Sequence, residues 1–272
     1  MSTTIDQGFI KQFEEEVFQA YQRQGSRLRN TVRNISGVVG STAVFQKIGK
    51  GIAKTKSRHG DVPVMNVERS VVEAELEDFY AGDWIDKLDE VKTNVDERNV
   101  IANAGAYALG RKTDELIIEQ LKETENTVAD AASGMSIEKV QEAFELLGEN
   151  NIPDDGERYC VVGWKQWSDL LSLKEFASAD YVGTDQLPFN GTQAKRWLGS
   201  LFIPHSGLPI NGSGIRTCFW YHKTAVGHAS GADVESDITW HGDKAAHFVN
   251  NMMSQGAIMI DGEGIVAIDC AE

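Results

Sequence analysis

Six histidines are the side chains of this chain best suited to hold a metal or to move a proton. They are His59, His205, His222, His228, His241 and His247. A zinc protease needs the string HExxH, and a zinc finger needs closely spaced cysteine and histidine pairs. His222 and His228 lie six residues apart, as do His241 and His247, so neither pair matches. We therefore predict no metal site and expect histidines that are satisfied in the core or at the surface.

The sequence also lacks the common patterns of catalysis. It contains no phosphate loop of the form GxxxxGK followed by Ser or Thr, and no GxSxG nucleophile elbow. The glycine-rich segment 207–214 contains Pro209 and precedes a strand pattern, which predicts turns rather than a phosphate cradle. The acidic clusters at 14–16 and 154–155 lack the spacing of a calcium loop. We therefore predict that the chain is not an enzyme, has no catalytic residues and binds no cofactor.

Three cysteines, Cys160, Cys218 and Cys270, lie far apart in the sequence. A disulfide framework would be even in number and denser, so we expect reduced, mostly buried thiols of a cytosolic protein. No apolar run reaches the roughly 18 residues that a membrane helix needs. The opening residues 1–18 carry acids where a signal peptide would carry basic residues. We expect a soluble chain without a membrane partner.

The formal charge of −15 is spread unevenly along the chain. Residues 1–60 carry ten basic and four acidic side chains, a formal charge of +6, which leaves −21 for the remainder. Residues 17–58 contain no acid and nine basic residues, which are Arg23, Arg27, Arg29, Arg33, Lys47, Lys50, Lys54, Lys56 and Arg58. The pattern predicts a basic arm on an acidic body. The arm is either a solvated loop or an electrostatic tether to nucleic acid or to acidic surfaces of neighbouring copies.

The elements that would position this arm begin with an amphipathic helix expected at residues 5–24. Glycines then interrupt the basic stretch, so residues 25–62 are predicted to be extended or loop-like. Residues 62–67 and 70–76 have the pattern of a pair of strands. A glycine-rich basic segment that closes into a long two-stranded excursion is poorly suited to burying a core. We expect it to reach a neighbouring molecule.

The strongest local pattern predicts a long helix at residues 96–123. Apolar residues recur there at helical spacing, and no proline interrupts them. Asn94 is the expected N-cap, and acidic side chains fill the first turn, where the helix dipole favours them. At ~1.5 Å per residue the helix would span roughly 42 Å. Gly105 and Gly110 weaken the helix without breaking it.

The C-terminal half alternates helices and strands. We expect helices at residues 137–148 and 164–173, the first capped by Ser136 and with Phe144 and Leu147 among its inward side chains. Strand patterns fall at 159–163, 197–203, 217–221, 247–253, 258–260 and 265–268, and residues 223–229 form either a short helix or a strand. The prediction is an α+β fold with one dominant long helix.

Four segments of this half carry a resemblance to a known family. They are CVVGWKQWSDLLSLKEFASADYVG at 160–183, RWLGSLFIPHSGLP at 196–209, CFWYHKTAVGHASG at 218–231 and DKAAHFVNNMMSQGAIMIDGEGIVAI at 243–268. In this order, after an extended loop and a long helix, they resemble the major capsid proteins of tailed bacteriophages. That family has the Hong Kong 97-type fold, with an N-terminal arm, an extended hairpin loop, a long spine helix, and peripheral and axial subdomains.

The resemblance implies an organisation for this chain. Its parts are an N-terminal arm at 1–45, an extended loop at 46–80, a peripheral domain at 81–132 and 241–272 that contains the spine helix at 96–123, and an axial domain at 133–240. It implies self-assembly through pentamers and hexamers into an icosahedral shell around double-stranded DNA. Further implied partners are a scaffolding protein, a portal and decoration proteins. Because the chain begins at Met1 with a short arm, we expect the scaffold to be a separate protein. The resemblance further implies assembly in the host cytoplasm and a final place in the virion capsid.

Alternatives from other classes stay open at this point. The chain could be a DNA-binding or DNA-condensing protein, in which case deletion of residues 1–60 would abolish DNA binding rather than assembly. It could be an enzyme whose site follows none of the motifs above. It could also be another virion component, such as a decoration or tail protein, although the long helix with its preceding loop argues against this.

Overall fold

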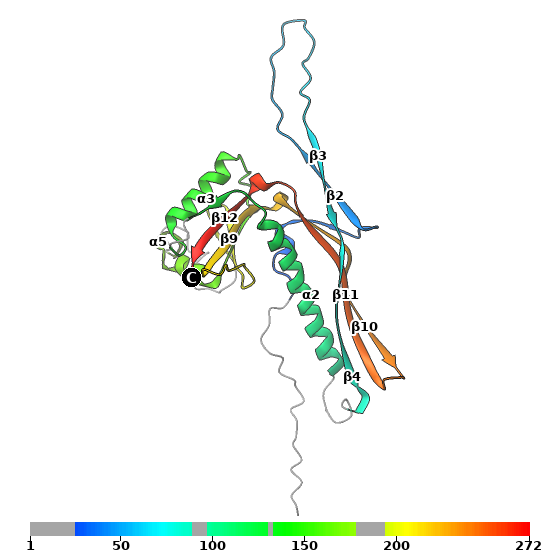
Figure 1. The fold of residues 1–272 in the computed structure, drawn as a ribbon. Helices are drawn as coiled ribbons and strands as arrows, with labels where there is room; N and C mark the ends of the chain where they lie inside the picture. Colours follow the sequence, from blue (N-terminus) through cyan, green and yellow to red (C-terminus); the bar gives the residue numbers. More distant parts are fainter. Residues whose placement is uncertain (1–24, 89–96, 130–132, 178–193) are drawn as a thin grey trace, which may run out of the picture. The chain divides into compact units, whose positions relative to one another are not determined.

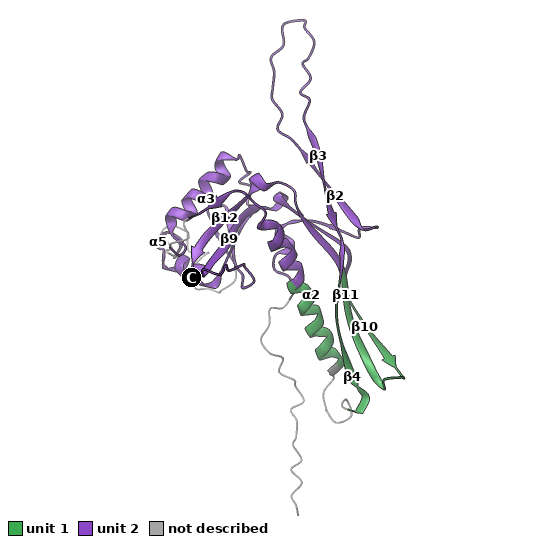
Figure 2. Ribbon diagram, in the orientation of Figure 1, with its two compact units in different colours: residues 1–25, 79–111, 234–253 green, residues 26–78, 112–233, 254–272 purple. Residues whose placement is uncertain are grey.

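The structure is a computed structural model that describes residues 25–88, 97–129, 133–177 and 194–272 (Figure 1). The helix expected at 5–24, the N-cap Asn94 and the basic residue Arg23 lie outside the described residues. The chain divides into two compact units (Figure 2). Unit 1 comprises residues 1–25, 79–111 and 234–253, and unit 2 comprises residues 26–78, 112–233 and 254–272. These units do not coincide with the two subdomains that we expected, whose boundaries stay a prediction.

Strands and helices alternate along the chain. The described strands are β1 (Arg33–Ser36), β2 (Thr42–Ile48), β3 (Arg69–Glu75), β4 (Glu77–Asp86), β5 (Thr127–Val128), β6 (Arg158–Val162), β7 (Lys195–Trp197), β8 (Ser200–Pro204), β9 (Ile215–His222), β10 (Val226–His241), β11 (Ala246–Met259) and β12 (Ile265–Ala271). The helices are α2 (Glu97–Leu121), α3 (Ile137–Glu149), α4 (Trp164–Ser172) and α5 (Lys174–Ala177), with short 3-10 turns η1 (Arg29–Thr31), η4 (Lys223–Ala225) and η5 (Gly262–Gly264). This mixture confirms the α+β prediction.

A six-stranded mixed sheet forms the centre of unit 2, in the order β5-β12-β9-β6-β8-β7. Strand β9 lies inside this sheet, antiparallel to both β12 and β6, and its residues Cys218–His222 are all buried. A strand that is covered on both faces is apolar without alternation, which explains the continuous run Phe219–Tyr221. The Trp220 indole donates a hydrogen bond to the Ser200 hydroxyl at 2.9 Å, so its one polar group is satisfied in the core.

Helix α3 packs beside β12 and β5 of this sheet. Ser136 caps it as expected, because its side chain accepts a hydrogen bond from the backbone N–H of Lys139. Leu147 is fully buried, also as expected. Phe144 also faces inward, with its ring centroid 6.0 Å from that of the buried Trp220, but it remains 37% exposed, and Ala143 takes the fully buried position beside it. A smaller side chain at the centre of the apolar stripe lets the helix approach the sheet closely.

The four-stranded sheet has the order β1-β10-β11-β4. Strands β10 and β11 are longer than predicted, since β11 runs unbroken through residues 254–257 and β10 continues from η4 to His241. The strand expected at 197–203 is instead a tight hairpin. Leu198 and Gly199 adopt positive φ angles of 48° and 69°, which turn β7 back antiparallel to β8.

Part of the expected arm packs against the body of unit 2. Leu28 and Val32 are 0% and 1% exposed and belong to the main hydrophobic core. Strand β1 pairs in parallel with the start of β10, from Arg33 opposite Gly227 to Ser36 opposite Ser230. Residues 26–36, which we expected to lie apart from any core, therefore contribute apolar surface and backbone hydrogen bonds to their own chain.

Helix α2 confirms the long helix predicted from the sequence, and it begins one residue later and ends two residues earlier. Its second half contributes Ile117, Ile118 and Leu121 to the core of unit 2. Gly105 lies in the first half, within unit 1, where an added Cβ would collide with the side-chain amide of Asn251 on β11. Among the described helices, none combines the length and the apolar character needed to cross a membrane.

Candidate assembly surfaces

Strands β2 and β3 form the antiparallel hairpin of the extended loop, with Thr42 opposite Glu75 and Ile48 opposite Arg69. The partner of the second strand is therefore 42–48, and the prediction of a strand at 62–67 was wrong. Pro63 removes a backbone donor from that segment, while 42–48 offers β-branched and aromatic residues without proline. The hairpin is the part of the expected loop that is held by strand pairing.

One face of the hairpin is buried and the other is exposed. Phe45 is 0% exposed and its ring lies 2.7 Å from the position that a Cβ at Gly227 would occupy, so only glycine fits there. The opposite face presents apolar side chains to solvent, and these are Val44, Ile48 and Val71. A strand pair with apolar residues on both faces is typical of a segment that packs between two bodies.

The loop beyond the hairpin, residues 49–68, contains no strand and extends away from β2 and β3 (Figure 1). Its apolar side chains are exposed, with Ile52 at 74%, Val62 at 75% and Val64 at 70%. Single exposed apolar residues are common on protein surfaces, but several within one projecting loop mark an interaction site.

Lys54, Lys56 and Arg58 lie in the same loop and are exposed. Within the described part of the chain, none of the three has an ion pair or a hydrogen-bonding partner. These are the members of the predicted basic set that keep their charge available for another molecule.

The base of the loop is tied to the turn η5 by two ion pairs. Lys47 contacts Asp261 and Lys50 contacts Glu263, each at 2.8 Å. The hydrogen bond and the charge of Glu263 raise the pKa of Lys50 above its ordinary value. Because these groups are solvent-exposed, the pairs contribute little stability, but they favour one direction for the chain as it enters the loop.

The arginines of the arm also contact their own chain. Arg27 donates to the carbonyl oxygen of Pro204 at 3.3 Å, and Arg29 pairs with Asp233 at 2.5 Å. The Arg33 guanidinium lies over the Phe45 ring, 5.7 Å from its centroid. The sequence grouped these arginines with the loop lysines as one basic set, but the structure separates them into a group with internal partners and a free group at 54–58.

A buried carboxylate fixes the start of the described arm. Asp114 on α2 is 0% exposed and accepts hydrogen bonds from the Ser26 hydroxyl at 2.5 Å and from the backbone N–H groups of Arg27 at 3.1 Å and Leu28 at 3.0 Å. The His205 Nε2 atom lies 3.0 Å from its other oxygen. A carboxylate with several donors is a strong, charge-assisted acceptor, so this cluster holds residues 26–28 against α2.

Burial acts to raise the pKa of Asp114, but the hydrogen bonds from His205, Ser26, Leu28 and Arg27 outweigh it and hold that pKa below its ordinary value. No sequence motif identified Asp114 as a structural anchor. The available signal was an acid three residues before Ile117 and seven before Leu121, on the buried stripe of the long helix.

His205, His222 and His228 each have hydrogen-bonding partners, as expected. His222 contacts the Thr224 hydroxyl at 2.8 Å, and His228 lies between the side chains of Asn34 on β1 and Gln255 on β11, at 3.0 and 3.1 Å. Burial lowers the pKa of His228, which favours the neutral imidazole. This network joins the arm strand to the long strands of the sheet.

The sequence profile described as phage capsid protein matches residues 5–272, nearly the whole chain. This chain belongs to the phage capsid protein family. A comparison with curated proteins found no significant match. The capsid protein is a structural component of the virion, and its copies associate with one another in the capsid. The competing interpretations, a DNA-condensing protein or a decoration or tail protein, are not favoured.

Solved structures give the same result at the level of the fold. The capsid protein matches a chain of Mycobacterium phage Che8 with a TM-score of 0.75 and 17% identity, over 96% of this chain and 97% of that one. It matches the capsid of the cyanophage P-SCSP1u with a TM-score of 0.74 and 17% identity, over 97% and 93% of the chains. It matches the capsid of a native GTA particle with a TM-score of 0.75 and 13% identity, over 100% and 99%. The capsid protein therefore has the Hong Kong 97-type fold.

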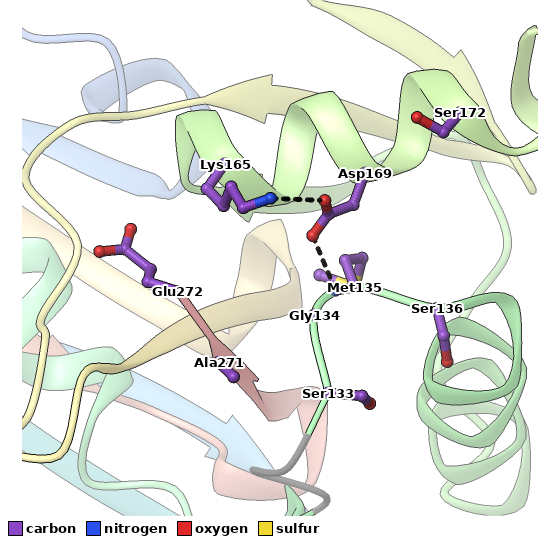
Figure 3. Close-up of a pocket in the computed structure, with 9 residues that line it drawn as sticks. All are labelled: Ser133, Gly134, Met135, Ser136, Lys165, Asp169, Ser172, Ala271 and Glu272. Carbon is purple, nitrogen blue, oxygen red and sulfur yellow. Dashed lines mark hydrogen bonds and ion pairs between the residues drawn. The ribbon is translucent and has the colours of Figure 1, made fainter.

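The capsid protein also has a surface hollow of about 580 Å³ in unit 2, beside α4 and the end of β12 (Figure 3). Its nine lining residues are Ser133, Gly134, Met135, Ser136, Lys165, Asp169, Ser172, Ala271 and Glu272. Asp169 accepts a hydrogen bond from the backbone N–H of Met135 at 3.2 Å and pairs with Lys165 at 3.4 Å. The lining combines hydroxyl groups with an ion pair and includes no histidine or cysteine, so it does not bring a nucleophile beside an imidazole base.

Proposed function

We propose that this capsid protein is the subunit of an icosahedral shell that encloses the double-stranded DNA genome of a tailed phage. Copies would associate as pentamers and hexamers in the host cytoplasm, guided by a scaffolding protein and interrupted by a portal at one vertex. Decoration proteins are a further class of partner. These finer features rest on the family to which the chain belongs and on the loop described above.

The main support for this proposal is the loop at 49–68, whose apolar side chains are exposed to solvent and are not covered by other described parts of the same chain. Ile52, Val62 and Val64 are each at least 70% exposed. Covering apolar area contributes about 25 cal/mol per Å², so a loop of this composition gains free energy when it lies on another molecule. In a closed shell every subunit offers such a loop and receives one, which multiplies the gain over the assembly.

The remaining charges agree with a shell subunit better than with a DNA-condensing protein. Arg27, Arg29 and Arg33 contact groups of their own chain, and Lys47 and Lys50 are paired with acids. The rest of the chain is strongly acidic and repels nucleic acid. Within the described residues 25–50 these cations are therefore engaged with their own chain, and the free cations of the basic set are confined to Lys54, Lys56 and Arg58 of the loop.

A shortened loop tests the proposal. Replacing residues 51–66 by an Asn-Gly turn should leave the subunit folded, because residues 51–59 are all exposed and none of 51–66 belongs to a buried core cluster. We expect the unfolding midpoint to change little while closed particles disappear from sedimentation profiles. A matched control replaces Ile210, which is 48% exposed outside the loop, by serine and should assemble normally. Normal shells from the shortened variant would contradict the proposal.

A further inference from the structure

Strand β10 has a free edge over most of its second half. On one side it pairs with β11, and on the other side β1 pairs only with residues 227–230. The backbone N–H of Val38 then donates to the carbonyl oxygen of Ser230 at 3.1 Å. Beyond this bond, no strand of the described residues pairs with that side of β10 from 232 to 241. An open edge of this kind presents unpaired backbone donors and acceptors and can accept an additional strand.

Acidic side chains recur at every second position along the first part of this edge. Asp233, Glu235 and Asp237 are acidic, and the intervening positions include Val234, Ile238 and Trp240. Strand β10 contains no lysine or arginine. Asp233 is paired with Arg29, whereas Glu235 and Asp237 have no cationic partner within the described part of the chain. Alternation places the three acids on one face of the strand.

The free loop cations have the same spacing. Lys54, Lys56 and Arg58 alternate with the small residues Ala53, Thr55 and Ser57. In an extended segment the three cations would lie on one face and the small side chains on the other. The chain has no other run of three cations at alternate positions.

One other set of alternating acids exists, at Glu73, Glu75 and Glu77. It is not carried by one strand, because β3 ends at Glu75 and β4 begins at Glu77. The backbone of Glu75 lies against Gly256 of β11. This contact within the chain restricts the access of another molecule to that end of β3. The edge of β10 is therefore the better match to the loop.

We propose that residues 53–58 of one copy add as a strand to the free edge of β10 in a neighbouring copy. This inference rests on the proposed function and names the place where the loop docks. A parallel register pairs Lys54, Lys56 and Arg58 with Asp233, Glu235 and Asp237, and an antiparallel register reverses that order. Both registers place Lys56 directly opposite Glu235. The backbone ladder supplies affinity, and the charges select the register.

A charge swap tests the pairing. Lys56→Glu alone and Glu235→Lys alone should each lower the fraction of protein in closed particles by about tenfold or more, since like charges then face each other at every contact. The two changes together should restore assembly to near the wild-type level. Glu145→Lys, at an exposed acid on α3 outside the hairpin and the loop, is the matched control and should assemble normally. Thermal unfolding of each variant checks that the subunit remains folded.

The outcomes separate this inference from the proposed function. If wild-type protein forms shells and the single variants do so equally well, or the double variant is not rescued, strand addition at Glu235 is wrong and the shell function stands. If Lys56→Glu is rescued by Glu73→Lys instead, the loop docks on β3 and the inference is also wrong. If wild-type protein forms no shells under any condition, the proposed function itself fails, and the inference with it.

A covalent test does not depend on assembly yield. Lys56→Cys combined with Glu235→Cys should give disulfide-linked multimers on a non-reducing gel after treatment of assembled protein with a mild oxidant. The three natural cysteines are fully buried and do not compete. Lys56→Cys combined with Glu73→Cys should remain single chains. A crosslink within one chain, or none at all in particles that have formed, would overturn the inference.

Discussion

The carboxylate of Asp114 is the residue on which the described start of the arm depends. It accepts hydrogen bonds from one hydroxyl and two backbone N–H groups of residues 26–28, and it contacts the imidazole of His205. The donors come from segments that are 86 to 91 residues away in the sequence. A single buried anion therefore fixes residues 26–28 on α2, in addition to the burial of Leu28 and the pairing of β1 with β10.

Replacing Asp114 by asparagine should destabilise the subunit. The asparagine NH₂ group would face at least one of the donors that the carboxylate now accepts, which leaves buried groups unsatisfied. We expect the free energy of unfolding to fall by about 2–3 kcal/mol, as measured by chemical denaturation. Glu115→Gln is the matched control on the same helix, because Glu115 is exposed and its pair with Lys112 contributes about 0.5 kcal/mol at most. Equal effects of the two substitutions would contradict the role assigned to Asp114.

The same carboxylate gives the subunit an acid-sensitive contribution to stability. Its pKa is lowered in the folded state, so the contribution is present at pH values above the unfolded pKa of about 3.9. It is lost as the pH falls from there through the lowered pKa of the folded protein. The difference in unfolding free energy between wild type and Asp114→Asn should therefore be constant near neutral pH and shrink below about pH 4. A difference that grows on acidification would contradict this assignment.

At the scale of elements, the long helix depends on a close approach to a strand in unit 1. An added Cβ at Gly105 would lie 3.1 Å from the carbonyl oxygen of Ala81 and would collide with the Asn251 amide, which donates to that same oxygen at 3.0 Å. Gly105→Ala should lower the free energy of unfolding by about 1–3 kcal/mol, despite the higher helix propensity of alanine. Gly148→Ala in α3, where nothing lies within 4 Å of the new atom, should be neutral or stabilising by up to about 1 kcal/mol. Denaturation curves of both variants check the contrast.

The sequence predicted elements where hydrophobic periodicity was strong. Helix α2 and strand β9 were found within a few residues because their apolar side chains face a core. Strand β2 was missed because glycines flank it, and the end of β10 was missed because its side chains are exposed on both faces. Such segments derive their conformation from strand pairing, which a local pattern does not report.

The candidate assembly surface at the loop could be predicted in part, from its charge. The free cations at 54–58 stand out by charge alone, and they remain free in the structure. The internal partners of Arg27 and Arg29 could not be predicted, since Pro204 and Asp233 come from strands far along the chain. Charge counts identified the basic segment, while tertiary contacts decided which of its charges remain available to other molecules.

At the scale of the whole molecule, the described part of the chain closes its hydrophobic clusters internally and leaves the loop at 49–68 exposed. The two hydrophobic clusters in unit 2 are closed by residues of the same chain, from Leu28 in the arm to Ile268 near the C-terminus. The loop at 49–68 gives its apolar and cationic side chains no such cover. Such a subunit gains further free energy when another molecule covers this loop, which is the requirement for a shell that assembles from folded parts.

Electron microscopy of the purified full-length protein tests this account most directly. Samples would be prepared over a range of salt concentrations, with and without co-expression of a scaffolding protein. We predict closed icosahedral particles under at least one condition, and their disappearance when residues 51–66 are replaced by a short turn. A folded protein that stays monomeric under every condition would contradict the account.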